Sequence, residues 1–473
     1  MFIFLNELSK VEFQKLGKFV KADYFNSNSK LKSIYTYLES LYPNITEDDL
    51  LPETLWLSSE SDSAFSDVNY RRLVSDFMII FERFLLQSEF ESDNGFSKIM
   101  LLENLRKRRL KKRFDKAYSE IIKEMDSSYS KDGEYYIRRF LVLGEKYQYE
   151  YGEKKYDYSP LLQEHSDNID NLILFEKLHI AHQMFQSSQN AGDEGIYKLD
   201  WLTESITKVE GNLNYYRKFH PNIYIIYLTY NMFKQNDDKY MTELRDFLNA
   251  SGANFPKTKL GYYYEYLSSY CLSRYNNGEK RYRKTALELY KIMDQKELLV
   301  IDNVILDSEF NNVVNVALGE KELSYAEKFI EKYKNKIDER FATDSYSLAK
   351  AKLMFNRKEY DKMFEFMLKV EYKDPYYYIN SKILAGRAFI ESNEPIRAKY
   401  IHDNLKQYGR TNTALSDLQK NTISIFLHYF NYLIKIQSTS GSEMIKLKKL
   451  ALTELLADKR VVPTQYWFKE KLS

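Results

Sequence analysis

The pattern of apolar and polar positions predicts helices along almost the whole chain. Apolar residues recur every three or four positions, the spacing that places them on one face of an α-helix. The first such stretch begins at Ser9 and Glu12, which fit the capping box that opens many helices. Further helices are expected over about 31–42 and 68–88. The acidic, serine-rich stretch 44–66 between them is expected to be a loop with one helical turn.

From about residue 96 onward the pattern predicts an almost unbroken succession of helices. Residues 221–230, PNIYIIYLTY, have the composition of a strand, but the apolar pattern continues beyond them to helical length. The chain has only 15 Gly and 8 Pro among 473 residues, less than half of the roughly 12% found in an average protein. This shortage of helix-breaking residues supports an all-α fold.

Similar helical segments return at nearly regular intervals in the second half of the chain. Ala286, Ala326, Met363 and Ala398 occupy equivalent positions in the second helix of four predicted helix pairs, with spacings of 40, 37 and 35 residues. A period of this length is typical of an α-solenoid, in which each pair buries its apolar face against its neighbours. Such an array presents a curved, extended surface.

Residues 343–375 resemble a tetratricopeptide repeat. Ala351 matches the small residue of the first helix, Tyr360 the aromatic residue after the turn and Pro375 the closing proline, whereas Met363 replaces the expected alanine of the second helix. Residues at matching positions in the flanking units are Leu318, Gly319, Ala326, Gly386, Phe389 and Ala398. The resemblance extends in a degenerate form over most of the chain.

Two stretches near the ends of the chain are similar to the two ends of a family of uncharacterised bacterial helical-repeat proteins. They are KLGKFVKADYFNSNSKL, residues 15–31, and LADKRVVPTQYWFKEKL, residues 456–472. This resemblance implies fold and a bacterial origin, and it carries no known activity. Together with the repeats it predicts a right-handed α-solenoid of tetratricopeptide-like pairs over 96–440. A helical N-terminal cap region is expected over 1–95 and C-terminal capping helices over 441–473.

The strongest local charge feature is a basic run between two predicted helices. The net charge of the chain is only +2, yet residues 39–93 hold 13 acidic and 3 basic side chains, a net charge of −10. Soon afterwards come seven basic side chains in eight positions: Arg106, Lys107, Arg108, Arg109, Lys111, Lys112 and Arg113. Either the run is a solvated helix corner, neutralised by the acidic stretch, or it contacts an anion or nucleic acid. Phe114 and Tyr118 beside it occupy core positions, and no zinc-finger or RNA-recognition signature is present.

The repeat alignment also predicts which side chains line the inner surface. The residues that follow the small position of each first helix are Arg106, Asn315, Lys352 and Arg387, and one turn earlier lie Leu102, Asn311, Leu348 and Ile383. Arginine forks and asparagine amides above an aliphatic floor suit an extended peptide that is acidic or ends in a carboxylate. The alternative is that these residues are exposed, as in any solenoid, without binding anything.

Few residues are suited to catalysis or metal binding. His179 and His182 lie three positions apart, on one helical face, but no third zinc ligand follows at a suitable spacing. The single cysteine, Cys271, excludes an internal disulfide framework. The sequence contains no phosphate-binding glycine loop, nucleophile elbow or kinase signature. We therefore expect no enzyme activity, no cofactor and no metal.

The remaining expectations concern location and function. The start, MFIFLNELSK, lacks a basic region and is a poor signal peptide, and no stretch approaches 18 apolar residues. We expect a cytoplasmic protein without membrane contact that acts as a non-enzymatic scaffold or adaptor for another protein or an extended peptide. Two alternatives stay open. One is a nucleic-acid-associated protein that uses residues 106–113, and the other is a regulatory protein that senses a short peptide.

Overall fold

A computed structural model describes residues 4–5, 8–60, 64–91, 95–153, 157–191, 197–372, 374–458 and 460–473. Across these ranges the chain forms 23 α-helices and two short 3₁₀-helices. The only extended pairings there are two isolated bridges, Ile301–Val304 and Ile305–Ile337. The prediction of an all-α fold is therefore confirmed. The helices form two compact units, residues 1–173 and 174–473, which are described separately.

The helices of the first unit follow one another with short connections. They are α2 (Lys10–Lys21), α3 (Ser29–Leu41), η1 (Asp48–Leu50), α4 (Pro52–Ser58), α5 (Asp67–Glu91), α6 (Gly95–Lys107), α7 (Lys111–Ser127), α8 (Gly133–Gly152) and the first part of α9 (Ser159–Ala191). The helices expected over 31–42 and 68–88 correspond to α3 and α5.

The helices α2 to α5 enclose an apolar core. The predicted capping box opens α2: the backbone N–H of Ser9 donates to Glu12 Oε2 at 2.8 Å, and the N–H of Glu12 donates to Ser9 Oγ at 3.3 Å. The described part of 44–66 is more helical than predicted, since it contains both η1 and α4. The reason is that Leu55 and Trp56 of α4 pack into the core.

The helices α6, α7 and α8 pack against one another in the same unit. Phe114 of α7 is fully buried and stacks on Tyr149 of α8, with 4.1 Å between the ring centroids. Tyr118 stacks on the other flank of Phe114 and is half-buried. Both aromatic residues therefore face the packing between helices, as their positions in the pattern predicted.

The second unit begins within α9 and contains all the later helices. They are α10 (Leu202–Glu210), α11 (Leu213–Phe219), α12 (Pro221–Gln235), α13 (Asp238–Ser251), η2 (Gly252–Asn254), α14 (Lys257–Asn276), α15 (Arg281–Gln295), α16 (Asp307–Gly319), α17 (Leu323–Tyr333), α18 (Ala342–Asn356), α19 (Tyr360–Met367), α20 (Pro375–Glu391), α21 (Pro395–Thr411), α22 (Asp417–Gln437), α23 (Gly441–Ala457) and α24 (Gln465–Leu472). Residues 221–230 lie inside α12, so the helical interpretation of this stretch is confirmed.

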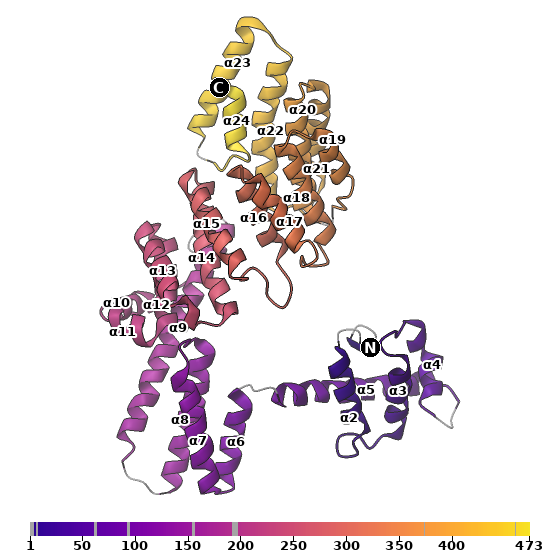
Figure 1. Ribbon diagram of the computed structural model, residues 1–473, viewed down its shortest axis with the longest axis vertical. Helices are drawn as coiled ribbons and strands as arrows, with labels where there is room; N and C mark the ends of the chain where they lie inside the picture. The colour runs from indigo at the N-terminus through magenta and orange to yellow at the C-terminus, as the bar shows by residue number, and fades with distance from the viewer. Residues whose placement is uncertain are drawn as a thin grey trace. The chain divides into compact units, whose positions relative to one another are not determined.

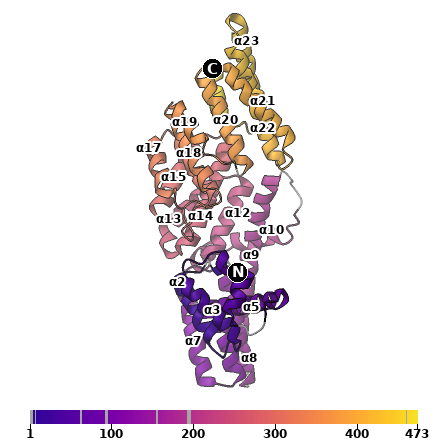
Figure 2. The same ribbon diagram turned by 90° about the vertical axis from the view of Figure 1, so that its right-hand side faces the viewer.

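Successive helices of the second unit pack as pairs, and each pair packs on the next (Figures 1 and 2). The pairs are α12–α13, α14–α15, α16–α17, α18–α19 and α20–α21, and α16, α18, α20 and α22 also pack each on the next of this series. At the centre of four of these pairs lie Ala286, Ala326, Met363 and Ala398, each with 0% of its surface exposed. The residues that the repeat alignment made equivalent are therefore all fully buried, and their equivalence as repeat positions stays a prediction.

The end of the chain folds back onto the second unit. The helix α24 packs against α22 and α23 (Figure 1), and Phe468 of α24 is fully buried in their common core. No helix among the described residues is long and apolar enough to cross a membrane. The predicted boundaries at 95/96 and 440/441 separate the expected caps from the expected repeat array, and they stay predictions. The observed division into two compact units lies at 173/174.

Candidate functional site

The second unit contains a cavity of about 890 Å³ along the series of first helices, here called the α16–α20 cavity. One face each of α16, α18 and α20 lines it, together with the turn between α14 and α15 and the segment 460–467. Aliphatic side chains such as Ile383 and Leu384 form part of its wall. The cavity size lies within the range of ordinary ligand sites.

Asparagine side chains are unusually frequent around the cavity. They are Asn276, Asn277, Asn312, Asn315, Asn356 and Asn380. Two of these amides are oriented by their own helices: Asn356 Nδ2 donates to the carbonyl oxygen of Lys352 at 2.8 Å, and Asn380 Nδ2 to that of Tyr376 at 2.9 Å. Each such amide keeps its oxygen as an acceptor for a ligand, and peptide backbones offer the matching N–H donors.

Two of the predicted inner-surface residues, Asn315 and Lys352, meet across neighbouring helices. Lys352 Nζ on α18 donates to Asn315 Oδ1 on α16 at 2.9 Å. Lys352 has no carboxylate partner within the described ranges, whereas many other lysines of this unit do. Its ammonium group is therefore held in place by a neutral amide and keeps its charge available to an acidic ligand.

A third predicted residue, Arg387 of α20, lines the same cavity. Its guanidinium carbon lies 4.5 Å from the ring centroid of Phe355 and 5.2 Å from that of Trp467. Nε of Arg387 is buried and has no hydrogen-bond partner in the described part of the chain. Burial lowers the pKa of Arg387 to about 10, although the carboxylates of Glu391 and Glu470 act in the opposite direction. A desolvated cation without a bound carboxylate is a typical feature of a ligand site.

The segment 460–467 forms one wall of the cavity through aromatic side chains. Tyr466 stacks on Tyr275 of α14, with 5.8 Å between centroids and 20° between ring planes. Arg283 donates through Nη1 to the Tyr275 hydroxyl at 2.9 Å and also lies over the ring of Tyr466, at 5.8 Å from its centroid. Arg283 is paired with Glu320 of the next helix pair, so it contributes to this wall without an uncompensated charge.

Trp467 is fixed by a single carboxylate. Its Nε1 donates to Glu391 Oε1 at 2.7 Å, and Lys471 Nζ pairs with the other oxygen of Glu391, also at 2.7 Å. Because Glu391 is used in this way, it does not pair with Arg387, which lies one turn earlier on α20. The end of the chain thus helps to leave Arg387 without a carboxylate.

The other two predicted inner-surface residues lie elsewhere. Asn311 is only 2% exposed, and its Nδ2 donates to the carbonyl oxygen of Asp307 at 2.8 Å, so it belongs to the packing between α16 and α18. Its Nδ2 also lies 3.4 Å from Ser345 Oγ of α18, so the amide is used within the packing and does not line the cavity. Arg106 belongs to the first unit, where Nε and Nη2 contact the carboxylate of Glu145 at 2.7 and 3.3 Å.

The basic run 106–113 occupies the corner between α6 and α7. Four of its side chains have partners nearby: Arg106 pairs with Glu145, Lys107 with Glu103, Lys111 with Glu153, and Arg108 donates to Asn104. These partners lie in α6, α8 and the residue after α8, not in the acidic stretch 39–93. Arg109, Lys112 and Arg113 are exposed and have no ion pair within the described ranges.

The predicted histidine pair has a structural environment. His182 is 1% exposed and packs edge-on against Tyr266, with 5.1 Å between centroids, and against Phe233 at 5.2 Å. Neither of its ring nitrogens has a hydrogen-bond partner in the described chain. His179 contacts Gln183 on the same helix. No group of three or more potential metal ligands occurs among the described residues.

Comparisons of the chain with family models, with curated proteins and with solved structures find no match. The function is therefore inferred from the cavity and its side chains alone.

Sequence reasoning missed the contribution of the chain's end to the cavity. Tyr466 contacts Tyr275, almost two hundred positions earlier, and no local pattern encodes so distant a contact. The available signal was compositional: QYWF, residues 465–468, places three aromatic residues side by side in an otherwise polar stretch.

Proposed function

We propose that the chain is a non-enzymatic scaffold or adaptor that binds an extended peptide segment of another protein in the α16–α20 cavity. The observation that supports this most strongly is the meeting of Asn315, Lys352 and Arg387 around one cavity, with both cations free of carboxylate partners in the described chain. We also propose that the pairs of the second unit form a right-handed α-solenoid of tetratricopeptide-like repeats, with this cavity on its inner surface.

The chemistry of the lining favours an acidic or carboxylate-ended peptide. Lys352 and Arg387 supply two positive charges in a partly desolvated place, where a charge-assisted hydrogen bond is stronger than in open water. The asparagine amides offer acceptors and donors at the spacing of successive helix pairs, which suits a backbone that runs across them. The aliphatic wall around Ile383 accommodates apolar side chains of the ligand.

Nucleic-acid binding through 106–113 is less well supported. Four of the seven basic side chains already have partners, and the neighbouring aromatic residues Phe114 and Tyr118 pack between helices, where no base could stack on them. Arg109, Lys112 and Arg113 alone would give a weak contact whose salt dependence is shallower than that of seven contacts.

A peptide-library selection on the purified full chain tests the proposal. We expect the enriched peptides to carry Asp, Glu or a free C-terminal carboxylate, and to bind Lys352→Ala at least tenfold more weakly than the parent protein. Lys328→Ala is the matched control, because Lys328 is an exposed lysine on α17 outside the cavity. Enriched peptides without acidic groups, or binding that falls equally in both variants, would contradict the proposal.

A further inference from the structure

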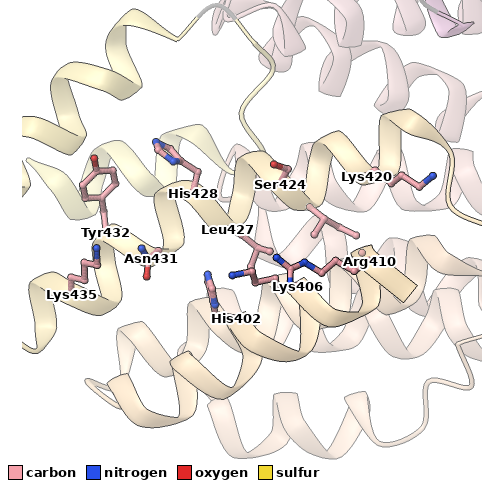
Figure 3. Close-up of a pocket in the computed structure, with 12 residues that line it drawn as sticks. His402, Lys406, Arg410, Lys420, Ser424, Leu427, His428, Asn431, Tyr432 and Lys435 are labelled. Atoms are coloured by element: carbon pink, nitrogen blue, oxygen red, sulfur yellow. The ribbon is translucent and has the colours of Figure 1, made fainter. Parts of the chain in front are cut away.

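A second, separate pocket of about 500 Å³ lies between α21 and α22, here called the α21–α22 pocket. Figure 3 shows that His402, Lys406 and Arg410 reach it from α21, and that Lys420, Asn431 and Lys435 belong to α22. None of the residues lining the α16–α20 cavity takes part.

The lining of this pocket is rich in positive charge. Four side chains, Lys406, Arg410, Lys420 and Lys435, carry full positive charges, and no aspartate or glutamate lines the pocket. Lys406, Arg410 and Lys435 have no ion pair within the described ranges. Within the described ranges Lys420 forms an ion pair with Asp417, at 4.0 Å, and the Asp417 side chain is almost fully exposed.

The carboxylates in the vicinity of the pocket are already used. Asp403 accepts from Lys399 Nζ and from His402 Nδ1, both at 2.9 Å. Glu454 of α23 contacts His428 Nε2 at 3.0 Å and accepts from the Tyr432 hydroxyl at 3.1 Å. These carboxylates hold the rim of the pocket in place and leave its cations uncompensated.

The spacing of the cations fits an anion with several charged groups. Lys406 and Arg410 are one helical turn apart, and in Figure 3 their side chains lie next to each other in the space between the two helices. Lys420 and Lys435 are 15 residues apart on α22, which corresponds to about 22 Å along the helix axis. Ser424 and Asn431 lie between them and add neutral donors.

The two helices approach closely at this place because α21 has a glycine there. A Cβ atom at Gly409 would lie only 3.3 Å from Cγ2 of Ile423 on α22. The close approach brings the basic face of α21 to that of α22, although like charges repel each other. A surface that keeps such charges together without acidic partners is suited to an anionic ligand.

We propose that the α21–α22 pocket binds a small molecule that carries a chain of two or more phosphate groups. Arginine offers a fork that matches a phosphate group, lysines act as mobile point charges beside it, and the pocket volume is that of a small-molecule site. Free inorganic polyphosphate and nucleotides share this chemistry. The pocket recognises the phosphate chain through Lys406 and Arg410, and Lys420 and Lys435 add positive charge at its two sides.

Calorimetric titration of the full chain at physiological ionic strength tests the proposal, with inorganic triphosphate and ATP as probes. We expect triphosphate to bind to the parent protein, and Lys406→Ala/Arg410→Ala to weaken this binding at least tenfold. The control Lys446→Ala/Lys449→Ala removes two exposed lysines of α23 outside the pocket, and we expect it to bind as the parent does.

The two probes distinguish the source of the phosphate chain. Equal affinity for triphosphate and ATP would assign recognition to the phosphates alone, and tighter binding of ATP would add a contact with the nucleoside. The absence of triphosphate binding at millimolar concentration would overturn the proposal. An equal loss in the pocket variant and in the α23 control would also overturn it, because it would indicate general charge attraction. Since the variants lie outside the α16–α20 cavity, peptide binding there is tested independently.

Discussion

Arg387 lies over the indole ring of Trp467 in the wall of the α16–α20 cavity, with the guanidinium carbon 5.2 Å from the ring centroid. The ring of Phe355 covers Arg387 as well, at 4.5 Å from its centroid. The arginine therefore contacts two aromatic rings, which favour a cation, while its Nε lacks a partner in the described chain. Its guanidinium group is held by aromatic neighbours and forms no ion pair within the described ranges.

The first prediction concerns Arg387→Met, which keeps an unbranched apolar stem between the two rings and removes the charge. Loss of the cation–π contacts lowers the stability of the folded state, whereas removal of a desolvated charge raises it. We therefore expect the free energy of unfolding, measured by urea denaturation, to stay within about 1 kcal/mol of the parent value, while peptide binding falls at least tenfold. A loss of stability above about 3 kcal/mol would show that Arg387 is a structural charge, and the binding argument would fail.

The second prediction concerns the buried imidazole of His182. Burial, with a smaller effect of His179, lowers its pKa from 6.5 to about 4. The neutral ring is therefore favoured in the folded state, and its contribution to stability is present above pH 6.5 and lost as the pH falls through about 4. The variant His182→Phe keeps an aromatic ring against Tyr266 and Phe233. We expect its stability relative to the parent to rise by about 2 to 3 kcal/mol between pH 7 and pH 4.5.

Urea denaturation of both proteins at the two pH values measures this change. A relative stability of His182→Phe that is independent of pH would show that the pKa of His182 is the same in the folded and the unfolded protein, which would contradict this prediction.

The third prediction concerns the buried carboxyl group of Glu309, whose contribution to stability changes with pH in the direction opposite to that of His182. Burial, with a further effect of Glu265, raises the pKa of Glu309 from 4.5 to about 7, and its Oε1 has no hydrogen-bond partner in the described chain. A raised folded-state pKa gives stability that is present below pH 4.5 and lost as the pH rises through about 7. We expect Glu309→Gln to gain about 2 to 3 kcal/mol of stability relative to the parent between pH 5 and pH 8.

Urea denaturation curves of the parent and of Glu309→Gln at pH 5 and pH 8 measure this change in relative stability. Glu288→Gln, an exposed glutamate of α15, is a suitable control and should show no such change. If the relative stability of Glu309→Gln were the same at both pH values, the carboxyl group would have to be solvated in the folded state.

The fourth prediction distinguishes the ion-paired basic residues of the run 106–113 from the exposed ones that form no ion pair within the described ranges. The hydrogen-bonded pair with Glu145 raises the pKa of Arg106, and both side chains are largely shielded from solvent, at 25% and 18% exposure. We expect Arg106→Ala to lower the free energy of unfolding by about 1 to 3 kcal/mol. Lys112→Ala/Arg113→Ala, which removes two exposed charges, should change it by less than about 0.5 kcal/mol. Similar effects in the two variants would contradict a structural role that is confined to the paired residues.

The local sequence pattern was sufficient to predict the helices and part of the candidate site. Ala286, Ala326, Met363 and Ala398, which the period made equivalent, are all fully buried, and Asn315, Lys352 and Arg387, which were expected on the inner surface, line one cavity. The same repeat alignment predicted Asn311 on the inner surface, whereas this side chain is only 2% exposed and is hydrogen-bonded to Asp307 and Ser345. It could not place Arg106 either, which belongs to the other unit.

Contacts between distant parts of the chain could not be predicted in the same way. Tyr466 and Trp467 complete the cavity only because the end of the chain folds back onto α14 and α20. The α21–α22 pocket depends on the seam between two successive helix pairs, where the repeat alignment assigns no ligand residues. In both places the chemistry arises from packing, whereas the sequence alone shows separate basic and aromatic residues.

The most direct test of peptide binding in the α16–α20 cavity is site-specific photo-crosslinking in the native cell. A photoreactive residue at position 315 lies in the cavity, and the same residue at position 328 lies on the exposed side of α17. We predict that position 315 crosslinks to a defined segment of one partner protein, rich in acidic residues or at its C-terminus, and that position 328 does not. Crosslinks to nucleic acid, or the same products from both positions, would contradict the account.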